Sequence, residues 1–244
     1  MMMTRMAKKS DVDRYECAWP PCPEPRGGGR RRANPLLQYR KKDWMKELEG
    51  WIALCAALAT SKTITHLDVS DCLLGSEPVA LLADAIKLMP AAVASIRLSQ
   101  NMITGSTGVG SSRAKYDLDL SGIIAFGKVA AVSKTLTSID LSNCGIAAAG
   151  IAEVTKFISA DAALARVSVL SNPIGADGAD ALIQVFEQNT NLRTLLGIEE
   201  GVTEVNLSEK NVDPGQAKIL AAELKASRAV AVVKKVALSH NNII

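Results

Sequence analysis

The chain has 244 residues and carries 28 Lys and Arg against 25 Asp and Glu, which gives a formal net charge of +3 at pH 7. That charge is too small to indicate a nucleic-acid-binding protein by itself, and no apolar run approaches the roughly 18 residues that a membrane-spanning helix needs. Hydrophobic residues make up 48% of the chain but aromatic residues only 4%, so Leu, Ile, Val and Ala must build the interior. Such a composition favours many thin layers over one large core.

Residues 1–42 are predicted to form a flexible N-terminal tail. More than half of the prolines lie there, together with a run of three glycines at 27–29. Such a stretch buries too little apolar surface to offset the entropy lost on ordering. Its basic clusters, Arg26–Arg32 and Arg40–Lys42, offer contacts to RNA, anionic lipid or an acidic protein surface, but aromatic residues do not interleave with them. A solvated basic tail is the simpler interpretation, and nucleic acid is not expected as a partner.

A helix that caps the following repeats is predicted within residues 43–62. It follows the tail directly and leads into the first repeated segment at residue 63. Apolar residues recur along it at helical spacing: Trp44, Leu48, Trp51, Ile52, Cys55 and Leu58. Their stripe would cover the first apolar layer, as terminal caps do in solenoids.

Residues 63–244 carry one pattern that recurs. It first reads Ile64-x-x-Leu67-x-Val69-x-x-Cys72-x-Leu74. Clear copies start at Val93, Leu136, Leu164 and Val233, and degenerate copies start near 115, 192 and 202. The spacing is 29 residues from Ile64 to Val93 and 28 from Leu136 to Leu164. Such a period indicates a stacked solenoid, which presents a surface rather than a catalytic pocket. The pattern does not define the geometry of 104–122 or 192–202.

Each repeat is predicted to be a short strand, a turn and a helix. The period-2 apolar residues of the strand point inward, and the apolar stripe of the helix packs against them. A small polar residue at the ninth position can bond the backbone groups left without partners where the chain turns off the strand. These ladder positions are Cys72, Asn101, Cys144, Asn172 and Asn241. We therefore interpret the two ladder cysteines as structural rather than redox residues.

The cysteines indicate a reducing compartment. The chain has five of them, an odd number, and two occupy ladder positions of separate repeats. Cys17 and Cys22, set among prolines, lack the second pair of ligands that a zinc site needs. The N-terminus has no apolar signal-peptide core, so we expect a cytoplasmic protein, with nuclear or organellar location left open.

The segment LARVSVLSNPIGADGADALIQVF, residues 164–186, resembles the leucine-rich repeat family. The likeness is to its β/α subclass of about 28 residues per repeat, which includes ribonuclease inhibitor and the Ran GTPase-activating protein. It covers about residues 43–244 and implies an α/β horseshoe with parallel strands on the concave face and helices on the convex face. The short central repeats, the truncated strand near 192 and the absence of a helix after the last ladder depart from the pattern. The last layer is therefore expected to need a partner or a further cap.

The second and fourth residues after each repeat start are predicted to point from the concave sheet into solvent. The partner-binding residues expected there are His66, Asp68, Arg97, Asp117, Asp119, Asp140, Arg166, Leu196 and Asn206. The middle of this face would be acidic, and the region near Leu170, Leu196 and Ile198 would be apolar. That combination suits a protein ligand with basic and hydrophobic anchors. The alternative is that these are ordinary solvated strand residues.

No catalytic constellation emerges from the sequence. The loop Gly105–Ser112 has the glycine spacing of a phosphate-binding loop but lacks its lysine, and His66 and His240 fall in the first and last repeats. No cofactor or metal is expected. The predicted function is a non-enzymatic protein–protein interaction module, scaffold or assembly subunit that binds a protein through the concave face. The alternative, which the resemblance implies, is a regulator of a small GTPase; ribonuclease inhibition fits poorly with so few Trp and Tyr.

Overall fold

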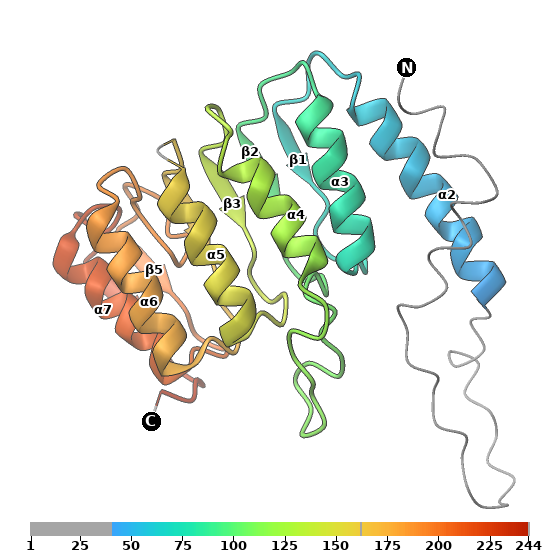
Figure 1. Ribbon diagram of the computed structural model, residues 1–244. Helices are drawn as coiled ribbons and strands as arrows, with labels where there is room; N and C mark the ends of the chain where they lie inside the picture. The colour runs from blue at the N-terminus through green and yellow to red at the C-terminus, as the bar shows by residue number, and fades with distance from the viewer. Residues whose placement is uncertain (1–40, 162, 244) are drawn as a thin grey trace, which may run out of the picture. The chain divides into compact units, whose positions relative to one another are not determined.

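Helices and short parallel strands alternate along the computed structural model of the chain, which describes residues 41–161 and 163–243 (Figure 1). The predictions for the basic clusters before Lys41 and for Cys17 and Cys22 lie outside these residues. Side chains are described from residue 48 onward.

Strands and helices follow one another in a fixed order. The helices are α2 (Lys41–Leu58), α3 (Ser76–Leu88), α4 (Ser121–Ala130), α5 (Ala148–Ala160), α6 (Gly175–Gln188) and α7 (Pro214–Ala226). The strands are β1 (His66–Asp68), β2 (Ser95–Arg97), β3 (Ser138–Asp140), β4 (Arg166–Ser168), β5 (Glu204–Asn206) and β6 (Lys235–Ala237).

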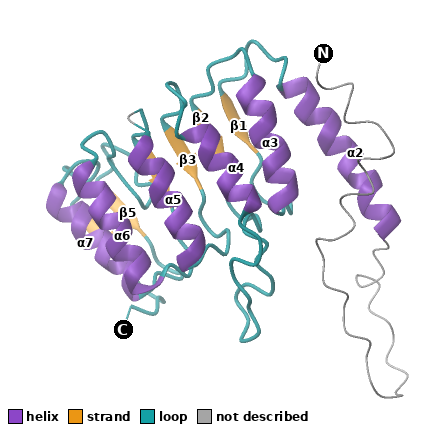
Figure 2. Cartoon of the chain, viewed as in Figure 1, coloured by secondary structure: helices purple, strands orange, loops and turns teal. Residues whose placement is uncertain are grey.

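The strands lie on one side of the helices, as Figure 2 shows. β1, β2, β3 and β4 form one parallel sheet in this order, and β5 pairs with β6 in a second parallel sheet. The central residues of neighbouring strands stay in register: Leu67, Ile96, Ile139 and Val167. Successive helices pack on one another in chain order from α3 to α7. The expected α/β repeat solenoid is therefore the observed fold.

The interior consists mainly of aliphatic residues from strands, turns and helices. Ile96, Ile139 and Val167 are buried on the helix-facing side of the sheet. Phe126 of α4 meets Phe157 of α5 edge to face, with ring centroids 6.2 Å apart. Because each strand is only three residues long, each apolar layer is completed by residues of the adjoining turns and by the buried stripe of a helix.

Helix α2 lies at the start of the stack. The indole N–H of Trp51 donates to the carbonyl oxygen of Pro78 in α3 at 2.9 Å, and Cys55 and Leu58 are buried in the core. The helix begins at Lys41, two residues earlier than the range 43–62 expected from the sequence. Its contacts are those of a helix that covers the first apolar layer.

Buried asparagines connect neighbouring repeats. Asn101 Oδ1 accepts the backbone N–H groups of Cys72 at 3.1 Å and Leu74 at 2.9 Å, in the preceding repeat. Its Nδ2 donates to the carbonyls of Val69 and Leu98, both at 2.9 Å. Asn172 makes the same four kinds of bond one repeat further on, to Cys144, Ile146, Leu141 and Val169. A single amide thus satisfies four backbone groups that the turn would leave unpaired.

The other ladder residues make fewer bonds. The Cys144 thiol is buried and donates to Leu98 O in the preceding repeat at 3.2 Å. Cys72 is exposed, and its thiol donates to Ser70 O within its own repeat at 3.3 Å. Asn241, partly exposed in the last repeat, accepts from Val212 N at 3.0 Å and donates to Leu207 O at 2.7 Å.

The strand predicted at 115–120 is absent, because β2 pairs directly with β3. Residues 104–120 instead form an insertion that projects beside α4 (green in Figure 1). Within it, Thr107 and Lys115 exchange two antiparallel backbone hydrogen bonds of 2.8 and 2.9 Å. The interval from Val93 to Leu136 is therefore one repeat with an insertion, not two short repeats.

The degenerate starts at 192 and 202 belong to one interrupted repeat. Thr194 bridges Arg166 of β4 in parallel, but Leu196 then bridges Ser168 antiparallel, so the chain turns out of the strand direction. It resumes as β5 only at Glu204. Helix α7 packs on α6. We call residues 192–203 the junction segment, since they lie between the two sheets.

Candidate interaction surface

The outward side chains of β1 to β4 form two rows on the side away from the helices. The register aligns His66, Ser95, Ser138 and Arg166 in one row, and Asp68, Arg97, Asp140 and Ser168 in the other. All except Ser168 are at least partly exposed. We call these seven exposed residues the strand face. Five of the predicted partner-binding residues lie on it: His66, Asp68, Arg97, Asp140 and Arg166.

Arg97 lies between two carboxylates on the strand face. Its Nη1 is 3.5 Å from Asp68 Oδ2, and its Nε is 3.6 Å from Asp140 Oδ2. Hydrogen bonds from the Ser70 hydroxyl and backbone N–H lower the pKa of Asp68, and Arg97 lowers it further. Asp140 also accepts the N–H and hydroxyl of Ser142. The two carboxylates therefore share a single cation on the strand face.

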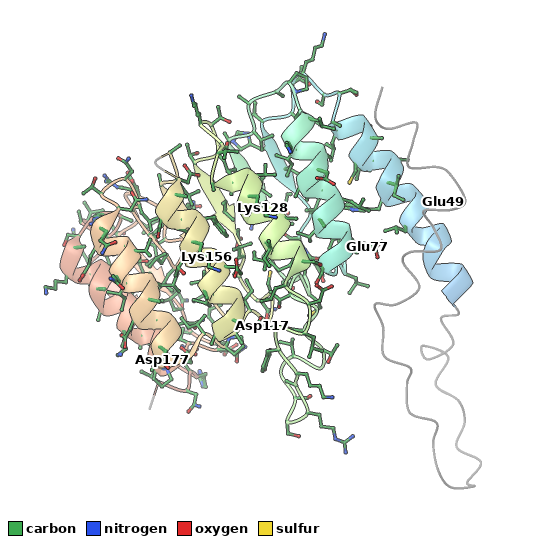
Figure 3. All side chains as sticks on the ribbon, in the orientation of Figure 1. Glu49, Glu77, Asp117, Lys128, Lys156 and Asp177 are labelled. Atoms are coloured by element: carbon green, nitrogen blue, oxygen red, sulfur yellow. The ribbon has the colours of Figure 1, made fainter. Side chains whose placement is uncertain are left out.

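Asp117 and Asp119 do not lie on the strand face, so their predicted place in an acidic centre is wrong. Asp117 Oδ1 accepts Ala147 N at 3.1 Å and Oδ2 accepts Gly150 N at 2.8 Å, at the start of α5 (Figure 3). Asp119 Oδ1 accepts Ser121 N at 2.9 Å, at the start of α4. The insertion carries both carboxylates to helix N-termini, where free N–H groups and the helix dipole favour negative charge.

The predicted apolar part of the face is also wrong. Leu196 is 3% exposed and Ile198 is 7% exposed, and both belong to the core. Leu170 is only partly buried. The reason is the turn of the junction segment, which directs Leu196 and Ile198 inward instead of continuing the strand alternation.

Ion pairs continue from the strand face onto the junction segment. Arg166 Nη1 is 3.4 Å from Glu199 Oε1, and its Nη2 donates to Gly197 O. Arg193 Nε is 2.8 Å from Glu200 Oε1. These groups are substantially exposed, so solvent screens the pairs and each contributes little to stability.

Asn206 lies apart from the other predicted residues, in the second sheet. It is exposed on β5, and its Oδ1 accepts Ser208 N at 3.0 Å. Next to it on the same strand, Glu204 is 2.7 Å from Lys235 Nζ of β6. Asn206 is therefore on the strand side of the solenoid but not on the continuous four-stranded sheet.

Glu223 is the functional candidate that the sequence interpretation missed. It lies on α7 with 1% exposure, and burial raises its pKa from 4.5 to about 7, although hydrogen bonds from Leu195, Thr194 and Leu196 act in the opposite direction. A signal was available: Glu223 follows Ile219 and Leu220 at the spacing of an apolar helix stripe.

Two cavities lie at the C-terminal ends of helices, away from these groups. One of about 270 Å³ is lined by residues of the α5 and α6 ends, including Asp161, and one of about 220 Å³ lies between the ends of α3 and α4. Among residues 41–161 and 163–243, no three His, Cys, Asp or Glu side chains are grouped as a metal site requires. In the same part of the chain, no helix is both long and apolar enough to cross a bilayer.

Comparison with a family model agrees with the repeat pattern of the sequence. A family model for the leucine-rich repeat matches residues 132–154, which contain β3 and the first half of α5. The solved structure described as "Leiomodin-1 Actin-Binding Site 2 (ABS2)" is similar at 13% sequence identity and a TM-score of 0.48, over 74% of this chain and 91% of that chain. At this score the likeness supports no inference about a partner. No curated protein matches the sequence. The described chain is an α/β repeat solenoid, and its assignment to the leucine-rich repeat family and to the ribonuclease-inhibitor-like subclass stays a prediction.

Proposed function

We propose that the chain is a non-enzymatic protein–protein interaction module, a scaffold or assembly subunit, that binds its partner through the strand face. The supporting observation is the placement of Arg97 between Asp68 and Asp140 on the side of the sheet opposite helices α3 to α7. Three parallel strands hold these side chains at a fixed spacing in a single row. A rigid row of alternating charges is a pattern that a partner surface with the opposite charges can complement.

The ion pairs on the strand face are weak enough to be exchanged for pairs with a partner. Arg97 and Asp68 side chains are 58% and 55% exposed, and exposed pairs contribute about 0 to 1 kcal/mol each. Little stabilisation is therefore lost when a partner displaces one of them. The expected partner presents basic groups to Asp68 and Asp140 and an acidic group to Arg97.

Affinity purification with two matched charge variants tests the use of this face. Arg97→Gln removes a cation from the strand face, whereas Lys128→Gln removes an exposed cation from helix α4 (Figure 3). If the strand face binds, Arg97→Gln lowers recovery of the cross-linked partner and Lys128→Gln leaves it unchanged. Equal recovery with both variants would contradict the proposal.

Regulation of a small GTPase, the alternative that the family resemblance implies, makes a different prediction. A regulator of this class accelerates GTP hydrolysis by its target, whereas a scaffold leaves the rate unchanged. Single-turnover hydrolysis by a panel of small GTPases, with and without the purified chain, separates the two functions. A rate increase that Arg97→Gln abolishes would replace the scaffold proposal with the regulator.

A further inference from the structure

The junction segment is held by a carboxyl group at the place where the sheet is interrupted. Glu223 Oε1 accepts the backbone N–H groups of Leu195 at 2.5 Å and Leu196 at 3.0 Å. The Thr194 hydroxyl lies 3.0 Å from Oε2 and 3.1 Å from Oε1. In a continuous sheet the backbone carbonyls of a neighbouring strand would accept hydrogen bonds from these N–H groups. Here the next strand, β5, begins only at Glu204.

The opposite side of the junction segment is bound to β4. The carbonyls of Thr194 and Leu195 accept Val167 N at 3.0 Å and Val169 N at 2.9 Å. The Thr194 hydroxyl also accepts the N–H groups of Leu196 and Ile198, both at 3.1 Å. The segment is therefore bonded between the last strand of the first sheet and one side chain of α7.

No cation is paired with Glu223 in the described residues. On the junction segment, Arg193 contacts Glu200 and Arg228 O, and Glu199 contacts Arg166 of β4. The remaining charged groups on the elements packed around it are also directed elsewhere. Arg228 stacks on Phe186 and donates to the backbone carbonyls of residues 186, 189 and 192. Lys218 pairs with Asp180. Asp177, Glu187 and Lys225 are exposed to solvent. Any charge on Glu223 is thus stabilised only by neutral donors in a buried site.

We propose that Glu223 and the junction segment form a pH-sensitive contact that controls local opening between the two sheets. Opening the contact exposes the carboxyl group to water, where it ionises freely. Closing it places the same group among buried residues, where the protonated form is favoured. The proton is therefore taken up on closing and released on opening, and no other group has to change its charge. This device is independent of which partner the strand face binds.

The direction of the effect follows from the pKa of Glu223, which burial raises from 4.5 to about 7. A carboxyl group with a raised pKa in the closed state contributes its full stabilisation below pH 4.5 and loses it as the pH rises to about 7. The junction segment is therefore held most firmly in mild acid and opens more readily above neutrality. Between pH 5.5 and 8 the opening constant should rise roughly thirtyfold.

Hydrogen exchange of the intact chain tests this contact. Protection factors for Leu195 and Leu196, corrected for intrinsic rates, are measured from pH 5.5 to 8 in the wild type, in Glu223→Gln and in Glu187→Gln. Glu187 is a matched control, because it is an exposed glutamate on the neighbouring helix α6. The wild type and Glu187→Gln should lose roughly thirtyfold in protection over this range, while Glu223→Gln should stay level.

Two results would overturn the proposal. One is a flat protection profile in the wild type, and the other is a Glu223→Gln profile as steep as that of the wild type. If Glu223→Gln does not fold, the carboxyl carbon of Glu223 is titrated by NMR in the wild type instead. A midpoint near 7 supports the contact, and a midpoint near 4.5 contradicts it.

Discussion

The continuous sheet β1–β4 and the interrupted repeat that follows it satisfy their backbone groups in different ways. In the first region each turn is bonded by an amide or thiol of the next repeat, as Asn101 and Asn172 show. In the second region the side chains come from α7: Gln216 Nε2 donates to Asn172 O at 3.1 Å, and Glu223 binds the junction segment. A helix on the opposite side of the solenoid thus replaces the bonds that a strand and its ladder residue normally supply.

This replacement changes how the two regions respond to their environment. The ladder asparagines carry no ionisable proton, so the bonds they make are the same at every physiological pH. Glu223 is ionisable and buried, so the bonds of the junction segment depend on its protonation state. A repeat protein with local stabilities of this kind opens first at its weakest interface.

The largest effect is expected from removing a ladder amide inside the continuous sheet. Asn172→Ala leaves the buried groups Cys144 N, Ile146 N, Leu141 O and Val169 O without this partner, and should lower the free energy of unfolding by about 3 kcal/mol or more. Urea denaturation monitored by circular dichroism measures it. The same change at Asn241, which is partly exposed, should cost roughly 1 kcal/mol. Equal losses would mean that position in the stack does not matter.

The second effect is a pH dependence of the free energy of unfolding, which arises from Glu223 in the interrupted repeat. Between pH 5 and 7.5 the free energy of unfolding of the wild type should fall relative to Glu223→Gln by about 2 kcal/mol, because the raised pKa favours the protonated carboxyl group in the folded state. Urea titrations at several pH values give this difference. An increase with pH instead would show that the donors from Thr194, Leu195 and Leu196 outweigh burial.

A smaller effect is expected at the insertion. Asp117→Ala removes the carboxylate that accepts Ala147 N and Gly150 N, and should destabilise the fold by roughly 1 kcal/mol. Thermal unfolding measures the change. Asp177→Ala is the matched control: Asp177 is exposed in the first turn of α6, and its loss should cost about 0.5 kcal/mol or less. If both cost the same, Asp117 acts only through the helix dipole.

The smallest effect on stability is expected on the strand face itself. Arg97→Gln should change the free energy of unfolding by less than about 0.5 kcal/mol, because its two ion pairs are exposed to solvent. Chemical denaturation at low and high salt tests this. A larger loss would mean that Arg97 supports the sheet, and its binding phenotype could not then be assigned to a partner contact.

The regular repeats were predictable because their physics is local and periodic. Alternation placed Leu67, Ile96 and Ile139 inside and His66, Asp68 and Arg97 outside without knowledge of any distant contact. The residues 115–120, KYDLDL, also alternate, and this made them look like a strand. Asp117 has a left-handed backbone, with φ of 54°, which breaks the extended conformation. Its carboxylate binds amides at residues 147 and 150, and no local pattern specifies that contact.

The junction segment was unpredictable for a related reason. Its strand pattern stops after Leu196, and the group that stabilises it lies 27 residues later on α7. A glutamate within an apolar stripe signals a buried carboxyl group, but not which backbone it binds. The exposed residues of β1 to β4 were likewise predictable, because each follows from its own repeat, whereas Asp117 and Asp119 of the insertion and Leu196 of the junction segment were placed wrongly.

The burial of Cys144 gives the central repeats a built-in reporter of their own opening. Burial raises the pKa of this thiol to about 12, so hardly any reactive thiolate forms while the layer around it is intact. Cys72 occupies the same position two repeats earlier but is exposed to solvent. An alkylating reagent added to the native protein should therefore modify Cys72 quickly and Cys144 only when the central layers separate. The rate at which Cys144 is labelled then measures how often that separation occurs.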